Sequence, residues 1–161
     1  MTKLFYKMTY PVVIRDYTTK DFKALVEIDA EAFPTHNPVY DVYTYITFGS
    51  DLLVADIGGK VVGYIALMDL GANAKIMSFA VKKEFRRKGI GTKLLKAAIK
   101  RCKEKGKRKI LLEVRISNTV AQHLYKKNGF KVIDVLPNYY NDGESAYLME
   151  LDLDVQNSNN S

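Results

Sequence analysis

Two glycines, Gly89 and Gly91, stand one residue apart in the stretch AVKKEFRRKGIGTKLL, directly behind three cations, Arg86, Arg87 and Lys88. An apolar run precedes them and an amphipathic run follows, which predicts a strand that turns into a helix. A helix N-terminus leaves N–H groups without partners and carries about half a positive charge. Glycine lets a ligand approach that backbone without a Cβ in the way. The stretch therefore predicts a site for a pyrophosphate-sized anion.

Two familiar phosphate motifs do not match this stretch. A P-loop requires GxxxxGK followed by Ser or Thr, and a dinucleotide fingerprint requires GxGxxG near the first strand of a parallel unit. The pattern present is RxxGxG, formed by Arg86, Gly89 and Gly91. Glycines that only make a tight turn remain the alternative.

A carboxylate, Glu113, interrupts the apolar run KILLEVRI, which is typical of a buried strand. Such a group is costly to bury unless it is paired or used in chemistry. It is a candidate general base, or else the partner of Arg115 or of a lysine on the neighbouring helix.

Tyr125 is the matching candidate acid, because a hydroxyl with a pKa of roughly 10 can protonate a leaving group. The alternative is an amphipathic core tyrosine, since Ala121, Leu124 and Tyr125 share one helix face. Cys102 lies on the apolar stripe of the preceding helix, so we expect a core residue rather than a nucleophile.

The elements that position these groups follow the order β-α-α-β-β-β-α-β-α-β-β. Gly58-Gly59 predicts a hairpin turn between two β-rich runs. The segment 35–48 is aromatic, is interrupted by Pro38, and is compatible with a short helix or a surface loop. A crossover should place strands 74–81 and 109–116 side by side and parallel. The fold class is mixed α/β, a mostly antiparallel central sheet with one parallel β-α-β crossover and flanking helices.

With 161 residues the chain predicts a single domain over 1–155, followed by a polar, disordered tail at 156–161. One cysteine and no membrane-spanning or signal-like run favour a cytoplasmic protein. The net charge is +7, and residues 82–109 hold 14 Lys/Arg against two Glu. A nucleic-acid-binding module is therefore an alternative, but no helix-turn-helix, zinc or RNP-like pattern supports it.

Three pieces in order, FAVKKEFRRKGIGTKLL, LLEVRISNTVAQHLYKKNGF and LPNYYNDGESAYLMEL, resemble the GNAT superfamily of N-acetyltransferases. Within it the chain is most similar to the RimI-type and archaeal protein N-terminal (Nα) acetyltransferases. The resemblance runs from Phe79 to Leu151, and it implies the GNAT fold, acetyl-CoA as co-substrate and no metal.

The resemblance also implies roles for individual residues, with Glu113 as base, acting through a water, and Tyr125 as acid. Backbone groups of Phe79, Ala80 and Val81 would meet the pantetheine arm. The pyrophosphate would lie on Arg87, Lys88, Gly89, Ile90, Gly91 and Thr92, with Arg86 at the first motif position. Asn118 and Tyr125 match further coenzyme contacts.

For the acceptor, the resemblance implies a polypeptide N-terminus, with one of Tyr139 and Tyr140 and the region from Phe33 to Tyr43 walling the groove. Archaeal relatives carry a Pro-Glu pair there, whereas this chain has Pro34-Thr35-His36. A ribosome or an auxiliary subunit is a possible partner; a membrane or a specific nucleic acid is not expected. The alternative acceptors are a polyamine, an aminoglycoside or a protein lysine.

Overall fold

The computed structural model describes residues 10–154. Its helices and strands follow the expected order. They are β1 (Val12–Asp16), a 3-10 turn (Thr19–Asp21), α2 (Phe22–Ala32), α3 (Pro38–Phe48), β2 (Asp51–Ile57), β3 (Lys60–Leu70), β4 (Asn73–Val81), a second 3-10 turn (Lys83–Phe85), α4 (Ile90–Glu104), β5 (Lys109–Arg115), α5 (Thr119–Lys127), β6 (Lys131–Leu136) and β7 (Ala146–Asp152).

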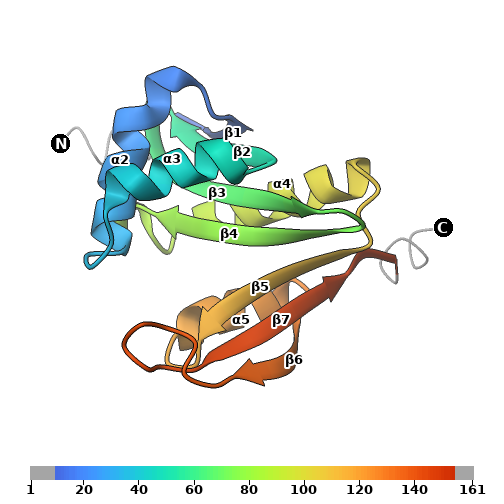
Figure 1. The fold of residues 1–161 in the computed structure, drawn as a ribbon. Coiled ribbons are helices and arrows are strands. Elements are labelled where there is room, and N and C mark those ends of the chain that lie inside the picture. The colour runs from blue at the N-terminus through green and yellow to red at the C-terminus, as the bar shows by residue number, and fades with distance from the viewer. Residues whose placement is uncertain (1–9, 155–161) are drawn as a thin grey trace. The chain divides into compact units, whose positions relative to one another are not determined.

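The strands are hydrogen-bonded in the order β1-β2-β3-β4-β5-β7-β6 (Figure 1). The pairs β1–β2, β2–β3, β5–β7 and β6–β7 are antiparallel, and β4–β5 is parallel. The predicted fold class, including the single parallel crossover, is confirmed. The contacts divide the described chain into two compact units, one holding residues 10–68 and 77–98 and the other 69–76 and 99–154. The prediction of one domain over 1–155 is not tested by this division, and the predicted tail lies outside the described residues.

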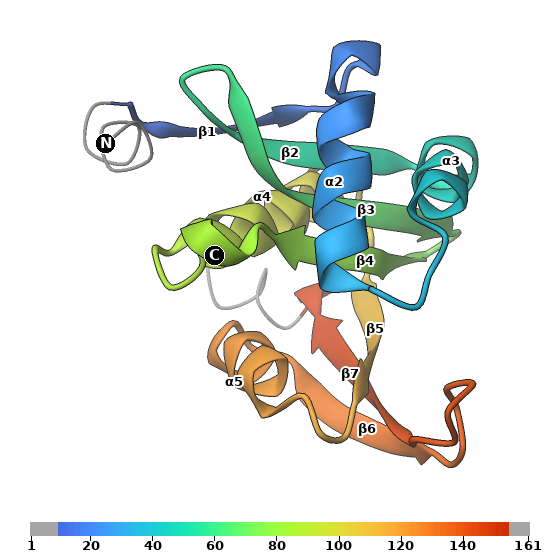
Figure 2. The ribbon, with the colours of Figure 1, turned by 90° about the vertical axis from the view of Figure 1, so that its left-hand side faces the viewer.

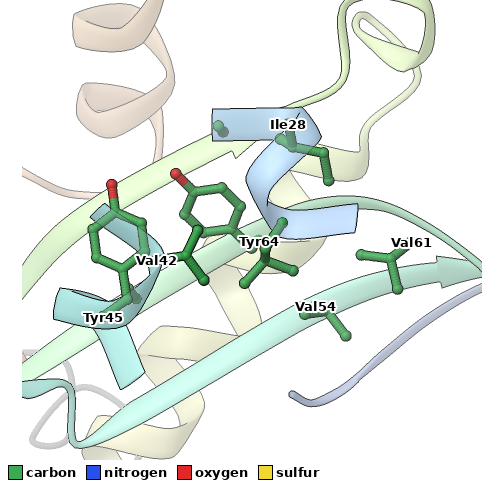
Figure 3. Packing of buried hydrophobic residues seen from close by; sticks show 9 residues of the cluster. Ile28, Val42, Tyr45, Val54, Val61 and Tyr64 are labelled. Atoms are coloured by element: carbon green, nitrogen blue, oxygen red, sulfur yellow. The ribbon is translucent and has the colours of Figure 1, made fainter. Parts of the chain in front are cut away.

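In the first unit, α2 and α3 cover one face of the strands and the start of α4 covers the other (Figure 2). The core under α2 and α3 is formed by buried side chains from both helices and from β2 to β4. Figure 3 shows Tyr45 of α3 and Tyr64 of β3 in this cluster, with both hydroxyls on the same side. This core therefore contains polar atoms that must find partners within it.

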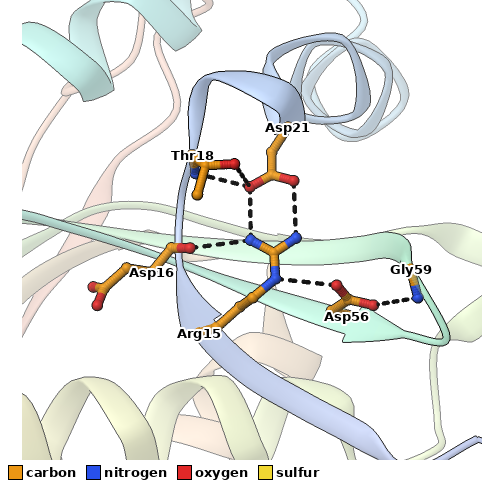
Figure 4. Close-up of polar contacts among 6 residues, drawn as sticks. All are labelled: Arg15, Asp16, Thr18, Asp21, Asp56 and Gly59. Atoms are coloured by element: carbon orange, nitrogen blue, oxygen red, sulfur yellow. Dashed lines mark hydrogen bonds and ion pairs between the residues drawn. The ribbon is translucent and has the colours of Figure 1, made fainter.

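The 3-10 turn that leads into α2 begins with a capping box between Thr18 and Asp21. Arg15 of β1 donates from both terminal nitrogens to Asp21, at 2.8 and 2.9 Å, and from Nε to Asp56 at 3.0 Å (Figure 4). The Asp56 carboxylate accepts in turn from the backbone N–H of Gly59 in the β2–β3 turn. This network ties the first strand, the first helix and the hairpin turn together.

The ambiguous segment 35–48 contains a helix. Asn37 accepts a hydrogen bond from the backbone N–H of Tyr40 at 3.1 Å, and Pro38 occupies the first turn. A capping asparagine followed by proline is a favourable helix start, because the missing N–H of proline has no partner there anyway. Pro38 therefore begins α3 rather than breaking it.

In the second unit, β7 lies between β5 and β6, as a final hairpin predicts. The expectation that KILLEVRI is buried on both sides is wrong. In β5 the side chains of Ile110, Leu112 and Val114 are buried, whereas the alternate positions, Glu113 among them, are half-buried. A strand in contact with a core on one face only gives this alternation. Among residues 10–154, no helix is long and apolar enough to cross a membrane.

Candidate active site

The glycine stretch forms a turn with two left-handed residues before α4. Gly89 has φ of 81° and Arg87 has φ of 60°. A Cβ built on Gly89 would meet nothing within 4 Å, so protein packing does not require a glycine at this position. The conformation favours one, and the space beside it is open to a ligand.

The start of α4 supplies the donors that an anion requires. Its first backbone bond runs from the N–H of Lys93 to the carbonyl of Gly89, at 3.1 Å. The N–H groups of Ile90, Gly91 and Thr92 therefore have no acceptor within the helix ladder itself. Exposed Arg87 and Lys88 add charge beside them. A left-handed turn, a helix N-terminus and two cations together suit a pyrophosphate.

Arg86 has a second, structural task. Its Nε donates to the carbonyl oxygen of Val81 at 2.9 Å, which ties the turn to the end of β4. The contact of Arg86 with a coenzyme stays a prediction.

The contact of β4 with a pantetheine arm also stays a prediction. Its parallel pairing with β5 covers only Asn73–Lys75 against Lys109–Leu111. The rest of β4, including Phe79, Ala80 and Val81, lies beyond that register. An extended ligand can use the backbone groups of such a strand segment as a partner strand would.

In the second unit, Glu113 has two protein partners, and neither is a predicted one. Lys75 of β4 places its Nζ 2.5 Å from Oε1 of Glu113. The hydroxyl of Tyr139 donates to the same oxygen at 3.2 Å. Within residues 10–154, no protein group makes a hydrogen bond to Oε2. Both partners thus meet Oε1, and the role of Glu113 as a proton acceptor stays a prediction.

Of the alternatives considered for Glu113, pairing with a cation is seen, but the cation is Lys75 rather than Arg115 or a helix lysine. Arg115 donates instead to Asp142 and Glu144, at 2.9 and 2.8 Å. Its guanidinium also lies 4.0 Å from the ring centre of Tyr140. Arg115 thus anchors the loop after β6, and the cation paired with Glu113 is Lys75.

That loop carries both predicted substrate-binding tyrosines. β6 ends at Leu136, so Tyr139 and Tyr140 lie in the loop rather than on a strand. Their rings pack edge to face with centres 5.0 Å apart. Tyr139 is hydrogen-bonded to the candidate base and Tyr140 is stacked on Arg115, so the loop is fixed to β5 at two points. Their contact with substrate stays a prediction.

Tyr125 is almost fully buried on α5, with its ring 5.7 Å from that of Phe130. Burial, and secondarily the nearby Tyr140 phenol, raise the pKa of the Tyr125 hydroxyl above its usual value. The hydroxyl is therefore protonated throughout the physiological range. Asn118 caps α5, since its side-chain oxygen accepts from the N–H of Ala121 at 3.1 Å. Coenzyme contacts of both residues stay predictions.

The region predicted to form the opposite wall lies in the first unit. Phe33 follows the last residue of α2, packs against the core and stacks on His36, with ring centres 5.2 Å apart. Nδ1 of His36 lies 3.0 Å from Oδ2 of Asp41. His36 is exposed, and its ring stacks on Phe33 while its Nδ1 lies beside Asp41. Cys102 is buried, as predicted.

Sequence reasoning missed a second carboxylate, Asp29 of α2, which is fully buried. The hydroxyls of Tyr45 and Tyr64 donate to its Oδ1 at 2.7 and 2.6 Å, and Ser78 bonds Tyr64 at 2.9 Å. Burial is the main cause that raises the pKa of Asp29 to about 6, and the neighbouring Asp41 carboxyl contributes. A signal was available: Asp29 is four residues after buried Leu25 and therefore on the apolar helix face.

Across the part of the chain that the structure describes, no group of three or more His, Cys, Asp or Glu side chains is arranged to hold a metal ion.

Comparison with known proteins assigns a family. Residues 22–130 match the Acetyltransferase (GNAT) family. An N-alpha-acetyltransferase of Sulfurisphaera tokodaii is 39% identical over 150 residues, 84% of this chain and 90% of the relative. The crystal structure of Ard1 from Thermoplasma volcanium superposes with a TM-score of 0.81 at 31% identity, covering 88% and 97% of the two chains. The ribosomal-protein-S18-alanine N-acetyltransferase from Escherichia coli superposes with a TM-score of 0.77 at 27% identity, covering 88% and 94%.

Proposed function

The chain belongs to the acetyltransferase (GNAT) family, and from that premise we propose that it acetylates the free α-amine at the N-terminus of a polypeptide, with acetyl-CoA as donor. Relatives of both groups named in the resemblance, the archaeal N-alpha-acetyltransferases and the ribosomal-protein-alanine N-acetyltransferases, support the acceptor class.

One observation carries the proposal, namely that Glu113 is bonded through Oε1 and presents Oε2. An α-amine has a pKa of about 7.7–8.0, so a weak base is enough to take its proton at neutral pH. A lysine side chain, at about 10.4, demands roughly 3.4 kcal/mol more for the same step. In this proposal Glu113, held beside Lys75, would take that proton.

The turn before α4 would hold the coenzyme in this proposal. Its backbone donors and the cations Arg87 and Lys88 would neutralise the pyrophosphate, and the β4 segment Phe79–Val81 would hydrogen-bond the pantetheine arm. These groups bind and orient the donor and take no part in proton transfer.

The reaction is a direct displacement. The amine nitrogen forms a bond to the acetyl carbon as the bond from that carbon to sulfur breaks. The amine proton goes to Oε2 of Glu113, directly or through a water. A free thiol has a pKa of about 8.5, below that of Tyr125, so Tyr125 stabilises the leaving thiolate as a hydrogen-bond donor and is readily reprotonated if it gives its proton up.

A thiol-release assay with an amine panel tests this proposal. The panel contains peptides that begin with Ser, Ala, Met-Leu and Met-Glu, N-blocked lysine peptides, spermidine and an aminoglycoside. We expect release with free-N-terminal peptides and, by mass spectrometry, acetyl on the α-amine. Release with spermidine, the aminoglycoside or lysine side chains alone would overturn the acceptor class and leave the family assignment standing.

A further inference from the structure

Lys75, which no sequence pattern singled out, makes the closest ion pair of the candidate base. It faces Glu113 because Lys75 pairs in register with Leu111, two residues before Glu113 on the same face of β5. Both side chains are partly exposed, 29% for Lys75 and 16% for Glu113, so the pair lies at a surface that a substrate can reach.

We propose that Lys75 is a positioning and specificity-determining residue, whose charge beside Glu113 makes the acceptor site select amines that are readily neutral. The inference rests on the proposed function, since it explains how that site would prefer α-amines to lysine side chains and polyamines.

The first step of the argument concerns charge. Lys75 neutralises Glu113, so the pair offers no net negative charge to attract a cation. A protonated amine that approaches Oε2 also approaches the ammonium of Lys75. Like charges a few ångströms apart near a protein surface change an equilibrium constant by about ten- to a hundredfold. The site therefore favours an amine that arrives without its proton.

The surrounding groups do not reverse this effect. Arg115 on β5 is already paired with Asp142 and Glu144, and Glu113 is opposite apolar Leu148 on β7. On the same face, Glu150 of β7 lies opposite Leu111 and is already paired with Lys109. The loop after β6 adds the phenols of Tyr139 and Tyr140, which are neutral at physiological pH because burial raises the pKa of both. Lys75 is thus the charge that dominates this carboxylate.

The second step concerns the acceptors. At neutral pH the neutral fraction of an α-amine exceeds that of a lysine side chain by about 300-fold, from their difference of roughly 2.5 pKa units. A site that takes the neutral form converts this difference directly into selectivity. Without Lys75, a protonated amine can bind Glu113 and transfer its proton there, so basic amines become better acceptors.

The test measures kcat/KM for a Ser-initiated peptide and for an N-blocked lysine peptide, in the wild type and in Lys75→Met and Lys75→Arg. We expect Lys75→Met to raise the lysine-to-Ser ratio at least tenfold, and Lys75→Arg to keep the wild-type ratio. Lys109→Met is the matched control: it removes a β5 cation that is paired with Glu150 of β7, and it should leave the ratio unchanged.

A pH profile separates this role from a structural one. Wild-type kcat/KM for the peptide should rise with pH through the α-amine pKa of about 7.7–8.0, and the rise should begin at lower pH in Lys75→Met. An unchanged ratio and profile in a folded Lys75→Met would overturn the inference. A wild type that acetylates no peptide α-amine would instead overturn the proposed function, so the two failures are distinguishable.

Discussion

Two carboxylates, Asp29 in the first unit and Glu113 in the second, have similar contacts but differ in burial and in neighbouring charge. In each, two neighbouring groups contact the same carboxylate oxygen: the hydroxyls of Tyr45 and Tyr64 at Oδ1 of Asp29, and Lys75 and Tyr139 at Oε1 of Glu113. Asp29 is fully buried between tyrosine hydroxyls, and among the described residues its Oδ2 has no hydrogen-bond donor. Glu113 is partly exposed and is compensated by Lys75. Tyrosine hydroxyls alone therefore do not define a proton-transfer site.

The difference lies in access and charge. Burial raises the pKa of Asp29 to about 6 and excludes a substrate from it. Glu113 keeps an oxygen open and has a cation beside it. We therefore propose a structural role for the first carboxylate and a catalytic role for the second, and the changes below test that division.

The largest effect is expected for Glu113→Gln. Because an amide does not accept a proton as a carboxylate does, kcat for a Ser-initiated peptide should fall by about 100-fold or more, with little change in acetyl-CoA affinity. Steady-state kinetics and calorimetric titration of the coenzyme measure the two quantities. Glu150→Gln, on the paired strand β7, is the control and should retain kcat. An equal loss of turnover and coenzyme affinity in Glu113→Gln would argue against a base.

Asp29→Asn should change the pH dependence of stability. The folded pKa of Asp29, about 6, lies above its unfolded value of about 3.9. The native state therefore binds more protons, and wild-type stability falls as pH rises from about 4 to 6, by up to about 3 kcal/mol. The free energy of unfolding of Asp29→Asn, measured in urea relative to wild type, should therefore rise by about 3 kcal/mol between pH 4 and pH 7. Parallel curves for the two proteins would contradict the assignment.

The coenzyme turn can be tested with a pair of glycines. Gly89 and Gly106 both have positive φ, and a Cβ on either meets nothing within 4 Å. Alanine should therefore strain the backbone of each by a similar amount, about 1 kcal/mol in unfolding experiments. Only Gly89→Ala should also weaken acetyl-CoA binding, by about tenfold, because its Cβ would occupy the space of the anion. Equal coenzyme affinity in the two variants would remove the anion site from this turn.

The smallest effects compare the tyrosines of the two carboxylates. Tyr139→Phe removes one of two bonds to Oε1 of Glu113 and should lower kcat a few-fold, with little loss of stability. Tyr64→Phe removes a buried bond to Asp29 and should cost about 1–3 kcal/mol of unfolding free energy, with kcat retained in the folded fraction. Chemical unfolding and steady-state kinetics on both variants measure these effects. A loss of stability in Tyr139→Phe together with a loss of kcat in Tyr64→Phe would refute the contrast between the two tyrosines.

The fold followed from local patterns because strand alternation, caps and turn glycines agree with one another. Local patterns did not predict that Lys75 is the partner of Glu113, because this contact depends on the register between β4 and β5. The pattern AKIMSFAV does place Lys75 on the face of Met77 and Phe79, but nothing in it says which residue of β5 lies opposite. Asp29 was overlooked because its donors come from α3 and β3, far away in the sequence.

The central claim is acetyl transfer to an α-amine, and one peptide tests it most directly. The peptide begins with a free Ser and contains one internal lysine, so that both amines compete for the same enzyme and acetyl-CoA. Tandem mass spectrometry locates the added acetyl group at low conversion. The account predicts acetyl on the N-terminal α-amine; acetyl on the lysine side chain alone would contradict it.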